Sequence, residues 1–228
     1  SIGDAFREQG GEISVHAPYY INFANPSDES AQNSYNYVLD SGRVLKQMGG
    51  KRCVFHSATQ GKMEREAAVA LTEERLKVLR DYIYMNNLQD LYFCPETMGK
   101  IAQIGTLEEI VRFCKIDDVY LPCIDFGHLN AREQGSLKTV SDYKDRLEYM
   151  IAELGYDRVK HFHVHFSKIQ YSAKGEVRHL TFEDTQYGPE FEPLAAALAE
   201  LKLEADIVSE SAGTQAEDAL AINECYTR

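Results

Sequence analysis

Short apolar segments alternate along the chain with longer stretches that have helical periodicity. The apolar segments are four to six residues long and rich in β-branched or aromatic residues, which is typical of buried parallel strands. We expect strands at Glu12–Val15, Arg52–Phe55, Leu91–Cys94, Val119–Ile124, Val159–Val164 and Ala205–Val208.

Helix signals separate these strands. Thr106 and Glu109 have the spacing of a capping box before an apolar run. Asp142–Leu154 has an apolar stripe at helical spacing and stops at Gly155, and Asp4–Gln9 is typical of the end of a helix. Similar stripes predict helices at Glu64–Tyr84, Phe191–Leu203 and Ala216–Tyr226.

The alternation of strand and helix predicts a parallel sheet covered by helices, which is an α/β fold. Two architectures fit this pattern: an open doubly wound sheet and a (β/α) barrel. No G-x-G-x-x-G or G-x-x-x-x-G-K-[ST] motif follows any predicted strand, which disfavours an open nucleotide-binding sheet. We therefore expect a TIM (β/α) barrel.

Every predicted strand ends in or is followed closely by a histidine or an acidic residue. These residues are His16, His56, Glu96, Asp125 with His128 three positions on, His163, and Glu210. In a barrel the carboxyl ends of all strands meet around one axis, so we expect these side chains to converge. Imidazole and carboxylate groups suit zinc and manganese, and buried carboxylates repel one another unless cations compensate them. The pattern indicates a metal centre.

Each of these residues also has an ordinary explanation. A single histidine at a strand end is more often a hydrogen-bonded structural residue than a ligand, and Asp125 or Glu96 alone would suit a helix cap. Recurrence at all the predicted strands argues against these explanations as a set. His161 alternates with His163, so we expect it to face the helix layer. His165 is either a ligand or a residue that supports one.

Composition narrows the function classes. The 24 basic and 36 acidic residues give a net charge of −12, which argues against a broad basic surface for nucleic acid but not against phosphate binding through metal ions. No apolar run approaches the roughly 20 residues of a membrane span, so we expect no membrane partner. The five cysteines form no C-x-x-C pair and indicate reduced thiols in a cytoplasmic protein, which we expect to be a monomer.

Several motifs resemble the endonuclease IV family of metal-dependent apurinic/apyrimidinic endonucleases, within the xylose isomerase-like barrel superfamily. The matching segments are His16–Phe23, Val54–His56, Glu96–Thr97, Cys123–His128, His163 with Lys168, and Glu210. They occur in the family's order from about residue 12 to the end of the chain.

The resemblance implies a TIM barrel with up to three zinc ions, with manganese as a possible substitute, that cleaves double-stranded DNA on the 5′ side of abasic sites during base excision repair. It implies a first metal held by His16 and His56. It implies a second held by Asp125, His163 and Glu210, with Glu96 between the two, and a third held by His128 and His179. Glu96 and Glu210 would be catalytic, and Tyr19 and Tyr20 would contact DNA.

The chain also departs from the family. His165 and Phe166 stand where the family has Asn-Asp, and Val177 stands where it has an aspartate, unless a one-residue shift brings in Glu176. Closure of the fold takes eight strands, so we expect residues 1–228 to form a single barrel domain that is N-terminally incomplete and lacks its first two strands.

Two other functions stay open. One is a one-metal sugar isomerase or epimerase of the same superfamily, which would use Glu96, Asp125, His163 and Glu210. The other is a non-catalytic barrel remnant.

Overall fold

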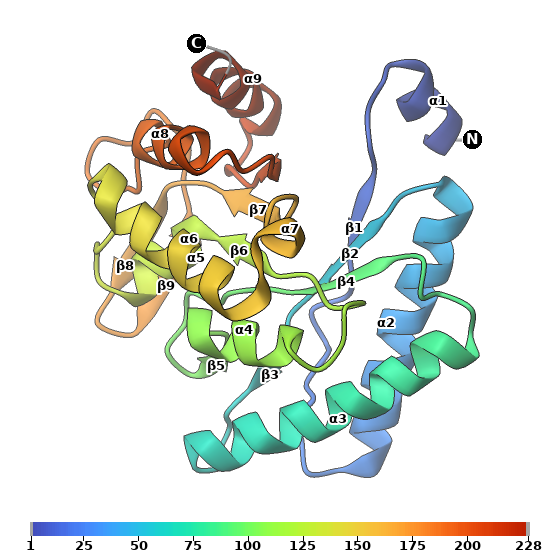
Figure 1. The fold of residues 1–228 in the computed structure, drawn as a ribbon. Helices are drawn as coiled ribbons and strands as arrows, with labels where there is room; N and C mark the ends of the chain where they lie inside the picture. Colours follow the sequence, from blue (N-terminus) through green and yellow to red (C-terminus); the bar gives the residue numbers. More distant parts are fainter. Residues whose placement is uncertain (1, 227–228) are drawn as a thin grey trace. The chain divides into compact units, whose positions relative to one another are not determined.

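The computed structural model describes residues 2–226. The chain forms two compact units, and Figure 1 labels the elements of both. Unit 1 comprises Ser1–Glu96 and Ala102–Pro122, and unit 2 comprises Thr97–Ile101 and Cys123–Arg228.

Unit 1 is built on a parallel sheet with the strand order β1-β2-β4. The strands are β1 (Ser14–His16), β2 (Arg52–Phe55) and β4 (Tyr92–Pro95). Their register places Val15, Cys53 and Phe93 side by side. The helices of this unit are α1 (Ile2–Glu8), α2 (Asp28–Met48), α3 (Arg65–Met85) and α4 (Leu107–Cys114). A short antiparallel ribbon joins β3 (Ala58–Thr59) to β5 (Gln103–Ile104).

Helix α2 packs against β1 and β2, and the sequence analysis did not predict it. The Ser27 side chain caps its start by accepting a hydrogen bond from the Ser30 N–H, and Gly49 ends it with a φ of 77°. Gly42 lets the helix approach the sheet, because a Cβ there would lie 2.9 Å from the Phe93 ring.

Unit 2 has a second parallel sheet with the strand order β10-β7-β6. The strands are β6 (Cys123–Asp125), β7 (His163–Phe166) and β10 (Asp206–Ser209). The helices are α5 (Phe126–Arg132), α6 (Val140–Leu154), α7 (Tyr156–Val159), α8 (Glu192–Leu201) and α9 (Gln215–Tyr226). An antiparallel hairpin follows β7 and consists of β8 (Ile169–Ser172) and β9 (Gly175–His179).

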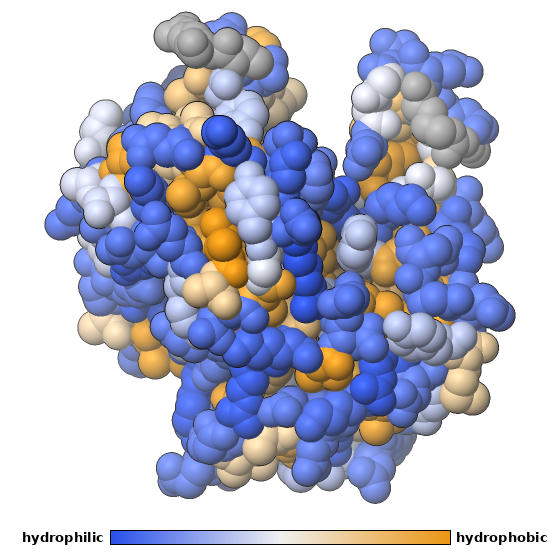
Figure 2. Space-filling model, in the orientation of Figure 1, coloured by the Kyte–Doolittle hydropathy of each residue, from blue (hydrophilic) through white to orange (hydrophobic). Residues whose placement is uncertain are grey.

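Aromatic side chains fill much of both cores. Phe23 and Phe55 meet edge to face in unit 1 with ring centroids 6.2 Å apart, and Phe166 and Phe191 do so in unit 2 at 5.1 Å. On the face shown in Figure 2 the hydrophobic residues form separate patches among hydrophilic ones. Among residues 2–226, no helix combines the length and apolar character needed to cross a membrane.

The structure confirms β2 at its predicted bounds and the capping box of α4. The other five predicted strands begin one to four residues too early, and two of them differ most. Val159 belongs to the short helix α7, and β7 begins only at His163. The predicted strand from Val119 to Ile124 is interrupted at Pro122, which has no N–H to donate, so β6 begins at Cys123.

Candidate metal centres

The first cluster lies in unit 1 and consists of His16, the last residue of β1, with His56 and Glu96, which follow β2 and β4. Their donor atoms lie within 4.8 Å of one another. Nε2 of each histidine is 3.1 Å from the same carboxylate oxygen, Oε2 of Glu96. The carboxylate is buried and the two rings are partly exposed, so a cation can reach this cluster from the side of the rings.

The hydrogen bond on the other side of the His16 ring makes this arrangement informative. Nδ1 lies 2.7 Å from the carbonyl oxygen of Ala17, and a carbonyl only accepts, so Nδ1 carries the proton. A neutral His16 therefore points the Nε2 lone pair at the Glu96 carboxylate. Two lone pairs at 3.1 Å repel unless a proton or a metal ion lies between them, so the geometry fits a cation.

The second cluster consists of Asp125, His165 and Glu210 in unit 2, with donor atoms within 4.8 Å of one another. Asp125 and His165 are register partners on β6 and β7, and Glu210 follows β10. Nδ1 of His165 is 3.0 Å from Oε1 of Glu210. Asp125 is buried and also caps α5, because its Oδ1 accepts the His128 N–H at 2.7 Å.

The expected ligand His163 is not in this cluster, and His165 lies beside Asp125 and Glu210 instead. The parallel register aligns His163 with Cys123, two residues before the pair formed by Asp125 and His165. His163 and His165 share a face of β7, so alternation along the sequence could not decide which of them reaches the level of Asp125. The structure thus places His165, whose role the sequence left open, beside Asp125 and Glu210.

The third cluster consists of His128, Glu176 and His179, again in unit 2 and within 4.8 Å. Nδ1 of His128 donates to the carbonyl oxygen of Thr97 at 3.0 Å, so a lone pair on Nε2 faces the Glu176 carboxylate at 3.4 Å. Nδ1 of His179 is 2.8 Å from the hydroxyl of Ser167, which orients that ring. The arrangement repeats the first cluster and fits a cation for the same reason.

A β-bulge brings the carboxylate into this cluster. The hairpin register pairs Gln170 with Arg178 and Tyr171 with Glu176, so Val177 is an extra residue on β9. The extra residue shifts the alternation by one, and Glu176 and His179 therefore face the same side although they are three residues apart. The bulge thus brings Glu176, the alternative considered in the sequence analysis, to the same side as His179.

Gly99 provides the space that this cluster needs. A Cβ at Gly99 would lie 2.6 Å from the Cβ of Glu176 and 3.1 Å from the His128 ring. Sequence reasoning missed this residue, because nothing local marks a glycine whose function is to leave room for side chains from two other segments.

The tyrosines after β1 are exposed, Tyr19 at 73% and Tyr20 at 80%. The Tyr19 ring centroid lies 5.2 Å from that of His16 and 5.1 Å from that of His56, beside the first cluster. His161 was expected to face the helix layer, and this is wrong. It precedes β7, and its half-exposed ring lies 3.8 Å from the Glu204 carboxylate.

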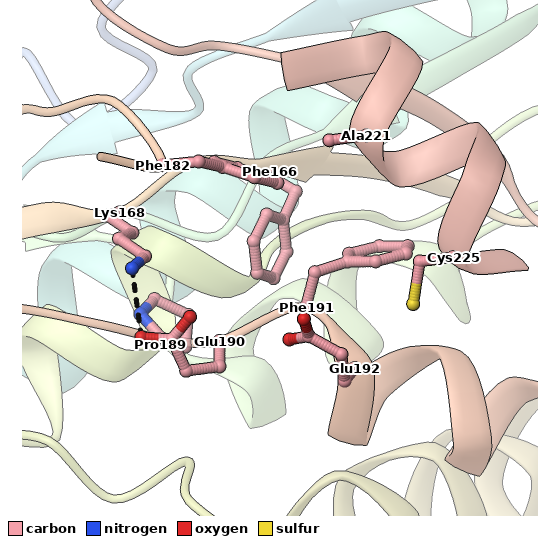
Figure 3. A pocket seen from close by; sticks show the side chains of 9 residues that line it. All are labelled: Phe166, Lys168, Phe182, Pro189, Glu190, Phe191, Glu192, Ala221 and Cys225. Atoms are coloured by element: carbon pink, nitrogen blue, oxygen red, sulfur yellow. Dashed lines mark ion pairs between the residues drawn. The ribbon is translucent and has the colours of Figure 1, made fainter. Parts of the chain in front are cut away.

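Unit 2 also contains a separate cavity of about 250 Å³, shown in Figure 3. The rings of Phe166 and Phe191 form part of its wall, and Lys168 is paired with the Glu190 carboxylate at 2.9 Å. Lys168 also donates to the carbonyl oxygen of Asp184 at 2.7 Å. The ammonium group of Lys168 is therefore occupied by an ion pair and a hydrogen bond. The metal clusters are the stronger candidates for the reactive site.

Residues 1–223 match the family described as Xylose isomerase-like TIM barrel. The chain belongs to this family. An uncharacterized protein of Methanocaldococcus jannaschii is 30% identical over 222 residues, which cover 96% of this chain and 79% of that protein. A probable endonuclease 4 of Methanosphaera stadtmanae is 28% identical over 161 residues, or 68% of this chain and 55% of the relative. The aligned region thus spans little more than half of that relative.

Solved structures confirm the barrel fold of the family. Endonuclease IV from Thermus thermophilus superposes with a TM-score of 0.66 at 16% identity and covers 99% of this chain and 81% of its own. The IolI protein with a bound zinc atom gives a TM-score of 0.70 at 15% identity, covering 100% and 82%. D-psicose 3-epimerase from Clostridium cellulolyticum gives 0.64 at 15%, covering 95% and 71%. These similarities show the fold alone. The reaction has to be inferred from the residues of the site.

Proposed function

We propose that this protein is a metal-dependent phosphodiesterase of the endonuclease IV type, which cleaves duplex DNA on the 5′ side of abasic sites. The third cluster carries the proposal. A one-metal sugar epimerase has no use for His128, Glu176 and His179, yet the β9 bulge and Gly99 both serve to assemble them. The probable endonuclease 4 relatives support the same substrate class.

The donor chemistry suits zinc or manganese. Each cluster combines imidazole nitrogen with carboxylate oxygen, which is the ligand set of these ions in hydrolytic enzymes. When bound, such ions supply Lewis-acid stabilisation of phosphate charge and lower the pKa of a coordinated water.

The side chains of the chain divide the remaining work. The carbonyl oxygens of Ala17 and Thr97 hold the rings of His16 and His128 in fixed orientations. We assign Glu96 in unit 1 and Glu210 in unit 2 as the catalytic carboxylates, each able to accept a proton within its own cluster. The exposed rings of Tyr19 and Tyr20 would stack against bases uncovered at the lesion.

The alternative is a sugar epimerase that uses the second cluster, which the similarity to D-psicose 3-epimerase favours. In that case His179 would be dispensable for catalysis, because it belongs to the third cluster.

An end-labelled duplex with a single abasic site tests the proposal. We expect the zinc- or manganese-loaded protein to nick the labelled strand on the 5′ side of the lesion, with activity lost in a chelator and restored by the metal. His179→Gln should abolish nicking, while the control His161→Gln should retain it, because His161 lies outside all three clusters. If there is no nick, but a ketose is epimerised equally well by the wild type and His179→Gln, the alternative holds.

A further inference from the structure

A second level of donor side chains lies next to the second cluster. Cys123, His163 and His165 have donor atoms within 4.8 Å of one another. All three are buried, with exposed fractions of 0%, 1% and 3%. The group lies wholly in unit 2, on β6 and β7.

The strand register explains why these side chains meet. Cys123 pairs with His163 and Asp125 pairs with His165 across the parallel strands, so all four point to the same face. Asp125 and His165 form the carboxylate level, nearer the carboxyl ends of the strands. Cys123 and His163 form the thiol level, two residues earlier on the same strands. The ring centroids of His163 and His165 are 5.1 Å apart, so the His165 ring lies close to the thiol level.

The chemistry of the thiol level is unusual for a barrel interior. This layer is ordinarily filled by branched apolar side chains, because burying polar groups is costly. A thiol together with imidazole nitrogens is instead the ligand set of structural zinc sites and of other thiophilic ions.

We propose that Cys123 Sγ, His163 and His165 form a second metal position, selective for a thiophilic divalent ion such as zinc, cadmium or cobalt. As the ion binds, the sulfur–metal bond forms and the thiol proton leaves to solvent, so one proton is released per ion. Donors on one tetrahedral ion lie roughly 3.3–3.8 Å apart for bond lengths of ~2.0–2.3 Å. Small side-chain rotations would close the present spacing.

His165 belongs to both levels, so the two positions compete for its ring. Manganese and magnesium prefer the carboxylates of Asp125 and Glu210, and cadmium prefers the thiolate. The lower position would thereby decide which ions occupy this face.

Cys53 provides a matched control. It is also buried on a parallel strand, and burial raises the pKa of its thiol to about 12. Within the residues described, it belongs to no group of metal-binding side chains, so it should stay protonated when metal is added.

The test is a titration of the full chain with cadmium and with cobalt, followed by the near-ultraviolet sulfur-to-metal charge-transfer band and by proton release. We expect the band to saturate at the intensity of one thiolate ligand per chain, with the ions taken up by the other clusters adding no thiolate band. Cys123→Ala should remove the band and weaken cadmium binding at least about tenfold, and Cys53→Ala should leave both unchanged.

Two further variants keep the test decisive. His163→Phe keeps a ring but removes its nitrogens, so the band should need more metal to develop. Asp125→Asn removes a carboxylate of the second cluster but keeps a capping oxygen, so the band should persist. Absence of the band in folded wild-type protein, or its survival in Cys123→Ala, would overturn the proposal, whatever the outcome of the nicking assay.

Discussion

At the scale of single residues, the direction of a ring nitrogen determines what a histidine can bind. Nδ1 of His16 donates a hydrogen bond to the carbonyl oxygen of Ala17, and Nδ1 of His128 donates one to the carbonyl oxygen of Thr97. Both therefore direct Nε2 at a carboxylate, Glu96 in one case and Glu176 in the other. The backbone thus prepares the ligand before any ion arrives, which reduces the cost of ordering the site on binding.

Glu96→Gln tests the charge of the first cluster. The amide keeps the size of the side chain and can donate to the Nε2 atoms of His16 and His56, but it lacks the negative charge that attracts an ion. We expect metal affinity at this cluster to fall by about 10–100-fold and nicking to fall with it. Metal content after dialysis and the nicking rate measure both effects, with the exposed Glu204→Gln as control. Full nicking by Glu96→Gln would exclude a catalytic metal at this cluster.

The sequence predicted that histidines and carboxylates lie at the strand ends. It did not predict which histidine of β7 lies beside Asp125. Alternation places His163 and His165 on one face and cannot say where β7 ends. That end depends on the pairing of β7 with β6 and β10, which are distant in the sequence. Gly99 was equally inaccessible, because its function depends on Glu176 and His128 packing against it.

At the scale of elements, the bulge in β9 is the feature on which the third cluster depends. Inserting one alanine between Gln170 and Tyr171 gives Val177 a partner on β8 and removes the bulge. Regular alternation then places Glu176 and His179, three residues apart, on opposite faces, so we expect loss of the ion bound at this cluster and of nicking. Deleting Val177 leaves Glu176 and His179 two residues apart on one face and should retain both. An insertion variant with unchanged metal content would show that the bulge does not position the ligand.

Helix α2 escaped prediction because its buried face is not uniformly apolar. Ser34 and Gly42 interrupt the stripe that Val38 and Leu45 belong to. Ser34 is accommodated because its hydroxyl donates to the Ser30 carbonyl at 2.9 Å, and Gly42 because the helix lies against Phe93. The first reason is a hydrogen bond within the helix and the second is a tertiary contact. The spacing of hydrophobic residues in the sequence reveals neither.

The capping box of α4 was predictable, but its ionic partner was not. Glu109 accepts hydrogen bonds from the backbone N–H groups of Gly105 and Thr106 and pairs with Arg65 at 2.7 Å. Burial opposes ionisation, but the hydrogen bonds from Arg65 and the backbone hold the pKa of Glu109 below its ordinary value of 4.5. The native state therefore gains stability from this group above that value and loses it as the pH falls through the lowered pKa.

We expect Glu109→Gln to destabilise the protein by about 1–3 kcal/mol at neutral pH. The difference from the wild type should shrink as the pH drops below 4.5, because the wild-type carboxyl then becomes protonated. Urea unfolding at several pH values measures this. Glu108→Gln, at an exposed position in the same helical turn, should change little. A destabilisation that stays constant down to strongly acidic pH would contradict an ionic contribution from Glu109.

At the scale of the whole molecule, a net charge of −12 must be reconciled with a proposed DNA substrate. Each cluster adds carboxylate charge within its own unit, Glu96 in unit 1 and Asp125, Glu176 and Glu210 in unit 2. Bound divalent ions reverse the local sign without any basic patch. The same reasoning makes the folded state sensitive to metal, because the carboxylates of Asp125 and Glu210 lie within 4.8 Å of each other in unit 2 and a bound ion would relieve their repulsion.

Metal removal should therefore lower thermal stability. An ion that binds only the native state stabilises it by about 2.7 kcal/mol at a concentration of 100 Kd. For a chain of this size, each kcal/mol shifts Tm by roughly 2–4 °C, so we expect the chelated protein to melt about 5–10 °C below the zinc-loaded protein. Calorimetry at rising zinc concentration measures the shift, which should continue to grow with the logarithm of free zinc. Sodium chloride at matched ionic strength screens charge without binding as a ligand and should not reproduce it. If Tm is the same with chelator and with excess zinc, the three clusters do not bind metal in the folded protein.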